Sequence, residues 1–118
     1  MVVGVVSASK SQYIYTLRPV RLEMLSEGPS TEEANILQQH VKYLERLAQT
    51  DKILLAGRTQ TSSASTFGIV IISATTADLA EEIMAKDPAI KGDIMTGELF
   101  PYRVAVMSPG GFRAMHDS

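Results

Sequence analysis

The 118-residue sequence contains no cysteine, and this absence excludes several kinds of site. Disulfide bonds, thiolate zinc sites, iron–sulfur clusters and a cysteine nucleophile all require the missing thiol. A chain without cysteine is typical of a reducing compartment, and we expect a cytoplasmic protein.

Long apolar segments are missing as well. The longest aliphatic run is Ile69–Ile72, whereas a membrane span requires roughly 18 apolar residues. Val2–Val6 is too short for the core of a signal peptide, and no basic residue precedes it. We therefore expect neither a membrane partner nor a signal peptide.

The chain has little net charge, with 11 basic and 13 acidic residues and a formal charge of −2. A protein that binds nucleic acid through its phosphates is normally basic, so nucleic acid is not an expected partner. The glycine-rich phosphate motifs GxGxxG and GxxxxGKS are absent, and so is the hydrolase motif GxSxG.

What the sequence has is enough apolar material, 45% of its residues, for the core of one domain. We expect a flexible leader at residues 1–11, a folded domain at 12–107 and a flexible tail at 108–118. The tail begins at the sequence Ser-Pro-Gly-Gly, which is typical of a break in regular structure.

Four segments have the composition or the alternation of β-strands. The last of them contains Pro101, which favours an edge strand, and the third is the richest in β-branched residues and is expected at the centre of the sheet. The predicted strands are residues 12–18, 53–56, 67–72 and 98–106.

Two amphipathic helices separate these strands. Ser30 and Glu33 have the spacing of a capping box and predict a helix over 31–49. The same spacing recurs at Thr75 and predicts a second helix, which must end near Asp87 because proline follows.

The predicted order is β-α-β-β-α-β, which folds into an α+β, ferredoxin-like plait with both helices on one face of a four-stranded antiparallel sheet. No element of this chain is left to cover the other face. An uncovered face would expose a large apolar surface, so we expect a homodimer in which two sheets pack face to face.

Two polar residues occupy helical positions that predict contact with the sheet. His40 lies three residues after Leu37 and four before Leu44, and Asp87 lies four after Ile83 at the end of the second helix, where the helix dipole disfavours a carboxylate. The antiparallel helices of a plait bring these positions together, and a carboxylate on one imidazole nitrogen makes the other a better base. The alternative is that Asp87 caps a turn and His40 is a partly exposed residue at the edge of the apolar stripe.

Other candidates come from the strands. Arg58, after the second strand, is a candidate for bidentate binding of an anionic substrate group, with solvation as the alternative, and the same applies to Arg18. Tyr13 and Tyr15 share a strand face and are expected to pack, although a tyrosine hydroxyl at a cleft mouth could donate to substrate. With one candidate histidine and no thiol, no metal site is expected. His116, in the tail, is assigned no role.

Several segments together resemble the YCII-related (YciI-like) domain family over residues 12–107. They are ILQQHVKYL at 36–44, LLAGRT at 54–59, FGIVI at 67–71 and the Asp87-Pro88 pair before ELFPY at 98–102. The resemblance implies a dimeric ferredoxin-like α/β barrel whose active-site pair is His40 and Asp87. It also implies proton transfer on small ring compounds without an obligatory cofactor, since some members are similar to dehydrochlorinases of chlorinated hydroxyquinones and the wider fold includes muconolactone isomerase.

The leading hypothesis is an enzyme in which His40, oriented by Asp87, takes a proton from a small, oxygenated, anionic substrate. Arg58 would stabilise the negative charge that develops, in an elimination or an isomerisation. The alternatives are a non-catalytic small-ligand-binding or accessory domain, and a purely structural dimerisation module.

Overall fold

The computed structural model describes residues 10–110, so most of the expected leader and tail, together with His116, lies outside the described residues. Its helices and strands follow one another in the predicted order, with two short helices added. They are β1 (Ser11–Pro19), α1 (Glu23–Ser26), α2 (Thr31–Gln49), β2 (Ile53–Arg58), β3 (Gly68–Ala74), α3 (Ala77–Ala85), α4 (Pro88–Lys91) and β4 (Met95–Tyr102).

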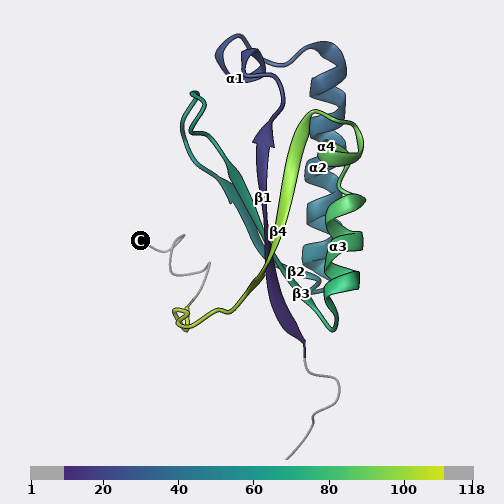
Figure 1. Ribbon diagram of the computed structural model, residues 1–118, viewed down its shortest axis with the longest axis vertical. Helices are drawn as coiled ribbons and strands as arrows, with labels where there is room; N and C mark the ends of the chain where they lie inside the picture. The colour runs from purple at the N-terminus through teal and green to yellow at the C-terminus, as the bar shows by residue number, and fades with distance from the viewer. Residues whose placement is uncertain (1–9, 111–118) are drawn as a thin grey trace, which may run out of the picture.

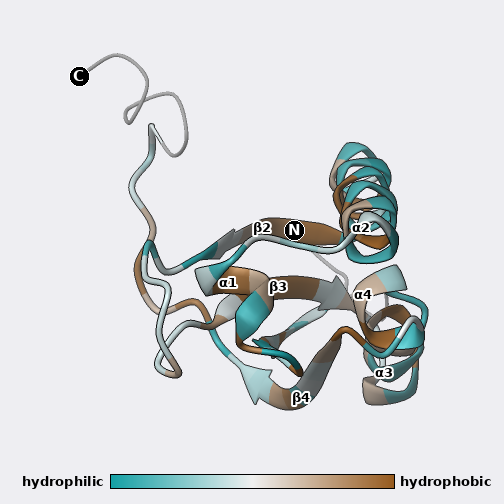
Figure 2. Cartoon of the chain, turned by 90° about the horizontal axis from the view of Figure 1, so that it is seen from above, coloured by the Kyte–Doolittle hydropathy of each residue, from teal (hydrophilic) through white to brown (hydrophobic). Residues whose placement is uncertain are grey.

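The four strands form one antiparallel sheet in the order β2-β3-β1-β4. Helices α2, α3 and α4 lie on one side of it, with α2 beside β2 and α3 beside β4, while α1 lies beyond the end of β1 (Figures 1 and 2). This is the predicted α+β plait. Strand β3 is central and β4 is at an edge, as the β-branched residues of β3 and the proline of β4 indicate.

Helix α2 begins where the capping box predicts. The Ser30 hydroxyl accepts from the Glu33 amide at 3.1 Å, and Glu33 accepts from the Ser30 amide at 2.8 Å. Glu33 is also held by Arg21, which donates to it from Nε at 3.0 Å and from Nη2 at 2.6 Å. This second contact attaches the segment that carries α1, for which the sequence predicted no helix, to the start of α2.

Several boundaries differ from the prediction, two of them for an identifiable reason. Helix α3 is capped by Thr76, whose hydroxyl accepts from the Leu79 amide at 3.2 Å, and not by Thr75. Strand β4 spans 95–102 in place of the predicted 98–106 because, among the described strands, it pairs with β1 alone. Tyr102 already pairs with Gln12 near the start of β1, so within residues 10–110 the residues that follow Tyr102 have no strand to join.

The core lies between the sheet and the helices. Tyr15, Val70 and Ile72 are fully buried there on the two central strands. Because neighbouring residues of a strand point to opposite faces, Leu55 and Phe100, which pair with Ile71 and Ile14, point away from the helices. They remain 48% and 41% exposed, so this face of the sheet presents apolar side chains that no described helix covers.

Candidate functional site

Asp87 is the anchor of the candidate site, and its local structure differs from the prediction. Helix α3 ends at Ala85, and Asp87 begins the separate helix α4, where its carboxylate accepts from the Ala89 amide at 2.9 Å. The sequence predicted that Asp87 lies at the C-terminal end of the second helix. This prediction is wrong, because Pro88 occupies the first position of a new helix and Asp87 caps it. The carboxylate therefore lies at a helix N-terminus, where the amide groups favour a negative charge.

Three donors surround this fully buried carboxylate. Besides the Ala89 amide, the Tyr15 hydroxyl donates to Oδ2 at 2.7 Å, and Nδ1 of His40 lies 2.7 Å from Oδ1. Burial of a carboxylate is costly unless hydrogen bonds replace its water, and here both oxygens are bonded. The structure thus brings His40 and Asp87 together. Asp87 also caps the turn at the start of α4, which was the alternative role predicted for it.

The hydrogen bonds determine which nitrogen of His40 is free. Because Asp87 accepts from its neighbours, the neutral imidazole carries its proton on Nδ1 and its lone pair on Nε2. No residue within 10–110 bonds to Nε2, and no buried side-chain nitrogen there lacks a partner, so Nε2 is accessible. The His40 side chain is 13% exposed. An imidazole oriented in this way can accept a proton from a ligand.

Two tyrosines next to Asp87 are held in their protonated form. Burial, followed by the charge of Asp87, raises the pKa of Tyr15 far above its ordinary value. The same two causes raise the pKa of Tyr43 to about 12. Tyr43 donates to the Ile83 carbonyl at 2.7 Å and so ties α2 to the end of α3. Both hydroxyls are therefore donors at neutral pH.

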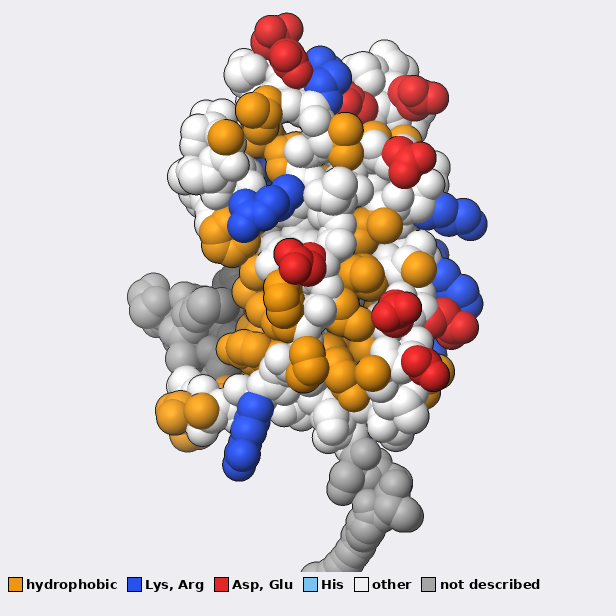
Figure 3. Space-filling view, viewed as in Figure 1, with side chains coloured by type: hydrophobic (Ala, Val, Ile, Leu, Met, Phe, Trp, Pro, Cys, Tyr) orange, Lys and Arg blue, Asp and Glu red, His pale blue; other side chains and the backbone are white. Residues whose placement is uncertain are grey.

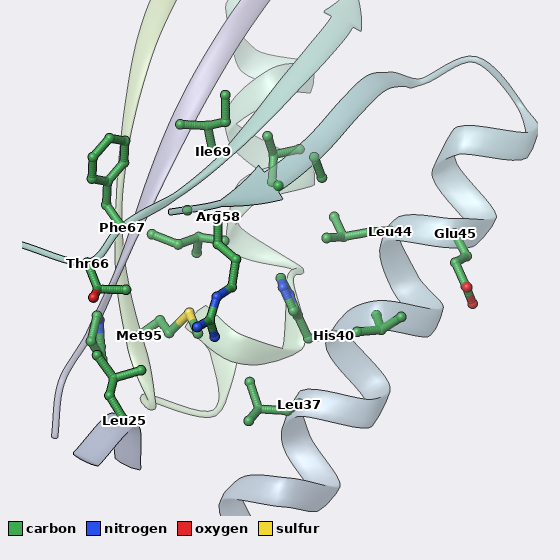
Figure 4. Close-up of a pocket in the computed structure, with 17 residues that line it drawn as sticks. Leu25, Leu37, His40, Leu44, Glu45, Arg58, Thr66, Phe67, Ile69 and Met95 are labelled. Atoms are coloured by element: carbon green, nitrogen blue, oxygen red, sulfur yellow. The ribbon is translucent and has the colours of Figure 1, made fainter. Parts of the chain in front are cut away.

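A cavity of about 430 Å³ lies between α2 and the sheet, and His40 lines it. Figure 4 shows the His40 ring and the Arg58 guanidinium directed into this space, from α2 and from the end of β2, while Glu45 points away. The wall is mostly apolar, and it comprises Leu17, Pro19, Leu25, Leu37, His40, Val41, Leu44, Glu45, Ala56, Gly57, Arg58, Thr66, Phe67, Gly68, Ile69, Val70 and Met95.

The remaining candidates have other surroundings. Arg18 lies over the ring of Phe67, 5.3 Å from its centre, and Tyr13 packs against the core, as expected. Tyr15 packs in the core as expected, and its hydroxyl also donates a hydrogen bond to Asp87. Its position on the buried face of a strand is the signal that could have indicated this role, because a buried tyrosine hydroxyl needs a partner.

Residues 10–110 contain no group of three histidine, aspartate or glutamate side chains placed to hold a metal ion. Over the same residues, no helix is both long and apolar enough to cross a bilayer.

Comparison with known proteins identifies the family. The model of the YCII-related domain matches residues 16–104, so the chain belongs to the YCII-related domain family and the resemblance noted in the sequence is confirmed. The curated proteins contain no match. A solved structure that is similar is the 5-chloro-2-hydroxyhydroquinone dehydrochlorinase (TftG) from Burkholderia phenoliruptrix AC1100 in complex with 2,5-dihydroxybenzoquinone. The TM-score is 0.55 at 18% identity, over 84% of this chain and 98% of that one, and the likeness shows a shared fold.

Proposed function

We propose that this member of the YCII-related domain family is an enzyme that transfers a proton on a small molecule, with His40 as the general base and Asp87 as the residue that orients it. One observation carries the proposal: His40 bonds a fully buried carboxylate through Nδ1 and has Nε2 free at the wall of a cavity of about 430 Å³. A base of this kind contributes roughly 10²- to 10⁴-fold to a rate.

In the proposed reaction, Nε2 of His40 removes a proton from a carbon or oxygen of the substrate. The ring becomes an imidazolium, and the negative charge of Asp87 at 2.7 Å stabilises it. The Tyr15 hydroxyl and the Ala89 amide hold the carboxylate in place while this charge develops. The mostly apolar wall lowers the local polarity and so strengthens these charge interactions.

Arg58 is the proposed partner of the negative charge that appears on the substrate. Its guanidinium is directed into the same cavity, and a planar guanidinium suits a carboxylate or an enolate oxygen. The substrate class is therefore a small compound with an apolar, ring-sized body and an acidic oxygen. The similar dehydrochlorinase, which was solved with a dihydroxybenzoquinone, supports this choice of class.

Two reaction types fit this arrangement. In an elimination, the electron pair of the broken bond to hydrogen forms a new double bond and expels an anionic leaving group, while His40 keeps the proton until solvent removes it. In an isomerisation, the electron pair shifts along the substrate and His40 returns the proton to a different atom. Each type needs one base and a stabilised oxyanion, and we propose that neither needs a bound cofactor.

A homodimer is part of the proposal. Apolar side chains such as Leu55 and Phe100 point from the uncovered face of the sheet. Figure 3 shows, from the direction of Figure 1, apolar side chains gathered in the middle of the molecule, with an acidic side chain among them and other charged ones around them. Surfaces of this kind are typical of interfaces between proteins. A second copy, packed sheet against sheet, would cover the uncovered face, and a cytoplasmic location remains our expectation.

The second candidate function is a non-catalytic domain that binds a small ligand. The observation that favours it is the predominance of apolar side chains in the cavity, since a binding pocket needs only a few polar groups for orientation. In that case His40 donates or accepts a hydrogen bond and no bond of the ligand changes. The two functions predict different outcomes in one experiment.

The experiment follows small hydroxylated ring compounds, among them hydroxyquinols and their chlorinated forms, in D2O by NMR. An enzyme that removes a proton from carbon introduces deuterium or forms product, and His40→Gln should abolish this. His116→Gln is the matched control. Binding of a compound in the cavity without exchange or product over prolonged incubation would support the second function. Undiminished exchange in His40→Gln would refute the first.

A further inference from the structure

The hydroxyl of Tyr15 bonds the oxygen of Asp87 that faces away from His40. Tyr15 Oη donates to Oδ2 at 2.7 Å, while His40 Nδ1 lies at Oδ1, and 72 residues separate Tyr15 from Asp87 in the chain. Tyr15 does not line the cavity. Tyr15 therefore contacts Asp87 on the side opposite His40, where it does not reach a ligand in the cavity.

We propose that Tyr15 is a positioning residue that sets the proton affinity of the His40–Asp87 pair. The inference rests on the proposed function for its meaning in catalysis, but the effect on proton affinity is a property of the folded protein and can be measured without a substrate. It goes beyond the packing role that the sequence predicts for this tyrosine.

The surroundings of Tyr15 hold its hydroxyl in one place. The residue lies on β1, a central strand, where it pairs with Val70 of β3 and Leu99 of β4, and it is fully buried. A packed aromatic ring between two neighbouring strands has little freedom to turn. With Oδ2 bonded to this fixed group and Oδ1 bonded to the Ala89 amide, the carboxylate has one orientation, and Oδ1 presents a fixed acceptor to His40.

The direction of the electrostatic effect follows from the donor. A hydrogen bond from Tyr15 stabilises the carboxylate and withdraws part of its negative charge, which weakens its attraction for a proton. Without that donor, the buried carboxylate would bind a proton more tightly, either on its own oxygen or on the imidazole that it faces. Because a hydrogen bond of 2.7 Å joins the two groups, they take up the proton as a pair, and Tyr15→Phe should raise the pH at which the pair becomes protonated.

Other charged and titratable groups lie around the pair and must stay constant in the comparison. Tyr43 of α2 is close enough to Asp87 for its own pKa to respond. Arg58 of β2 is directed into the cavity, whereas Glu45 of α2, at its wall, points away from it. On the side of α3, Lys86 precedes Asp87 and lies 3.7 Å from Glu82. None of them donates a hydrogen bond to Asp87, so Tyr15→Phe changes one contact and keeps the rest.

The test is an NMR titration of the two histidines in the full chain, with Tyr15→Phe compared with the unaltered protein. A hydrogen bond to a charged group corresponds to roughly one to two pKa units, so the titration at His40 should move up by about one unit. His116 provides the internal reference. Tyr13→Phe, the same chemical change two residues away on the same strand face, is the matched control and should leave the titration of His40 in place.

A titration of His40 that is the same in Tyr15→Phe and in the unaltered protein would overturn the inference. It would not contradict the proposed function. If Tyr15→Phe does not fold, 3-fluorotyrosine at position 15 keeps the ring and offers a stronger donor, and the titration should then move down. An upward movement, or none, would overturn the inference equally.

When a substrate has been identified, the pH dependence of kcat provides a second test. Tyr15→Phe should shift the acid limb of kcat upward by about one pH unit, which lowers kcat roughly tenfold below that limb, with KM unchanged because Tyr15 does not touch the ligand. A tyrosine that only supports the fold would lower activity at all pH values without moving the limb. If the titration moves but His40→Gln turns over normally, the positioning effect is real and the proposed function is wrong.

Discussion

The Nδ1 atom of His40 lies 2.7 Å from Oδ1 of Asp87, although 47 residues separate the two along the chain. Helix α2 supplies the imidazole, and the cap of α4 supplies the carboxylate. The contact fixes the tautomer of His40 and leaves Nε2 at the wall of the cavity.

Asp87→Asn should lower kcat by about 10²- to 10⁴-fold, with little change in KM. The amide keeps the size of the side chain and can still cap α4, but it no longer stabilises the imidazolium and favours the wrong tautomer. Steady-state kinetics with circular dichroism will separate activity from folding. Asp78→Asn, at an exposed position in the first turn of α3, is the control. An Asp87→Asn variant with normal kcat would exclude the proposed mechanism.

Arg58→Gln should raise KM for an anionic substrate by about tenfold or more, since a charge-assisted hydrogen bond to a ligand is worth about 1.5–3 kcal/mol. Arg58→Lys should restore the binding only in part, because an ammonium group cannot bind an oxyanion in the same bidentate way. Affinity measured by calorimetry checks both variants. Arg103→Gln, outside the residues that line the cavity, serves for comparison. If Arg58→Gln and Arg103→Gln bind the anionic substrate with equal affinity, Arg58 does not contact the substrate.

Glu33→Gln should reduce the stability of the protein at neutral pH and have little effect near pH 2. The Arg21 hydrogen bonds, together with the Ser30 amide, lower the pKa of Glu33 from 4.5 to about 2. A lowered pKa in the folded state means that the contribution is complete above about pH 4.5 and disappears as the pH falls towards 2. Urea unfolding at several pH values measures it, with exposed Glu32→Gln as the control. A difference between variant and parent that does not depend on pH would contradict this assignment.

Leu55→Glu combined with Phe100→Glu should convert the proposed dimer into a monomer, because charged groups on the uncovered sheet face would have to be buried in the interface. Sedimentation velocity gives the mass in solution. Leu79→Glu places the same charge at an exposed leucine of α3 and should leave the dimer intact. A parent protein that sediments as a monomer at all concentrations would refute the proposed assembly.

Much of the fold could be predicted because its signals are local. The capping box at Ser30 and the apolar stripe behind it defined α2 to the residue, and the β-branched run identified the central strand β3. The prediction of 98–106 for β4 was less accurate, since a strand needs a partner and β1 ends the pairing at Gln12. The end of the second helix was wrong at Asp87 because a proline that ends one helix can also begin another.

The sequence by itself determined the order of the elements and the fold, because periodicity and caps act within a few residues and the handedness of the plait limits the topology, and it left the pairing of His40 with Asp87 as one of two interpretations. Only the tertiary structure decided that Tyr15 bonds the far oxygen of Asp87 and that Arg58 faces the cavity of His40. These relationships join residues from different strands and helices. Their geometry depends on register and packing, which no local pattern in the chain encodes.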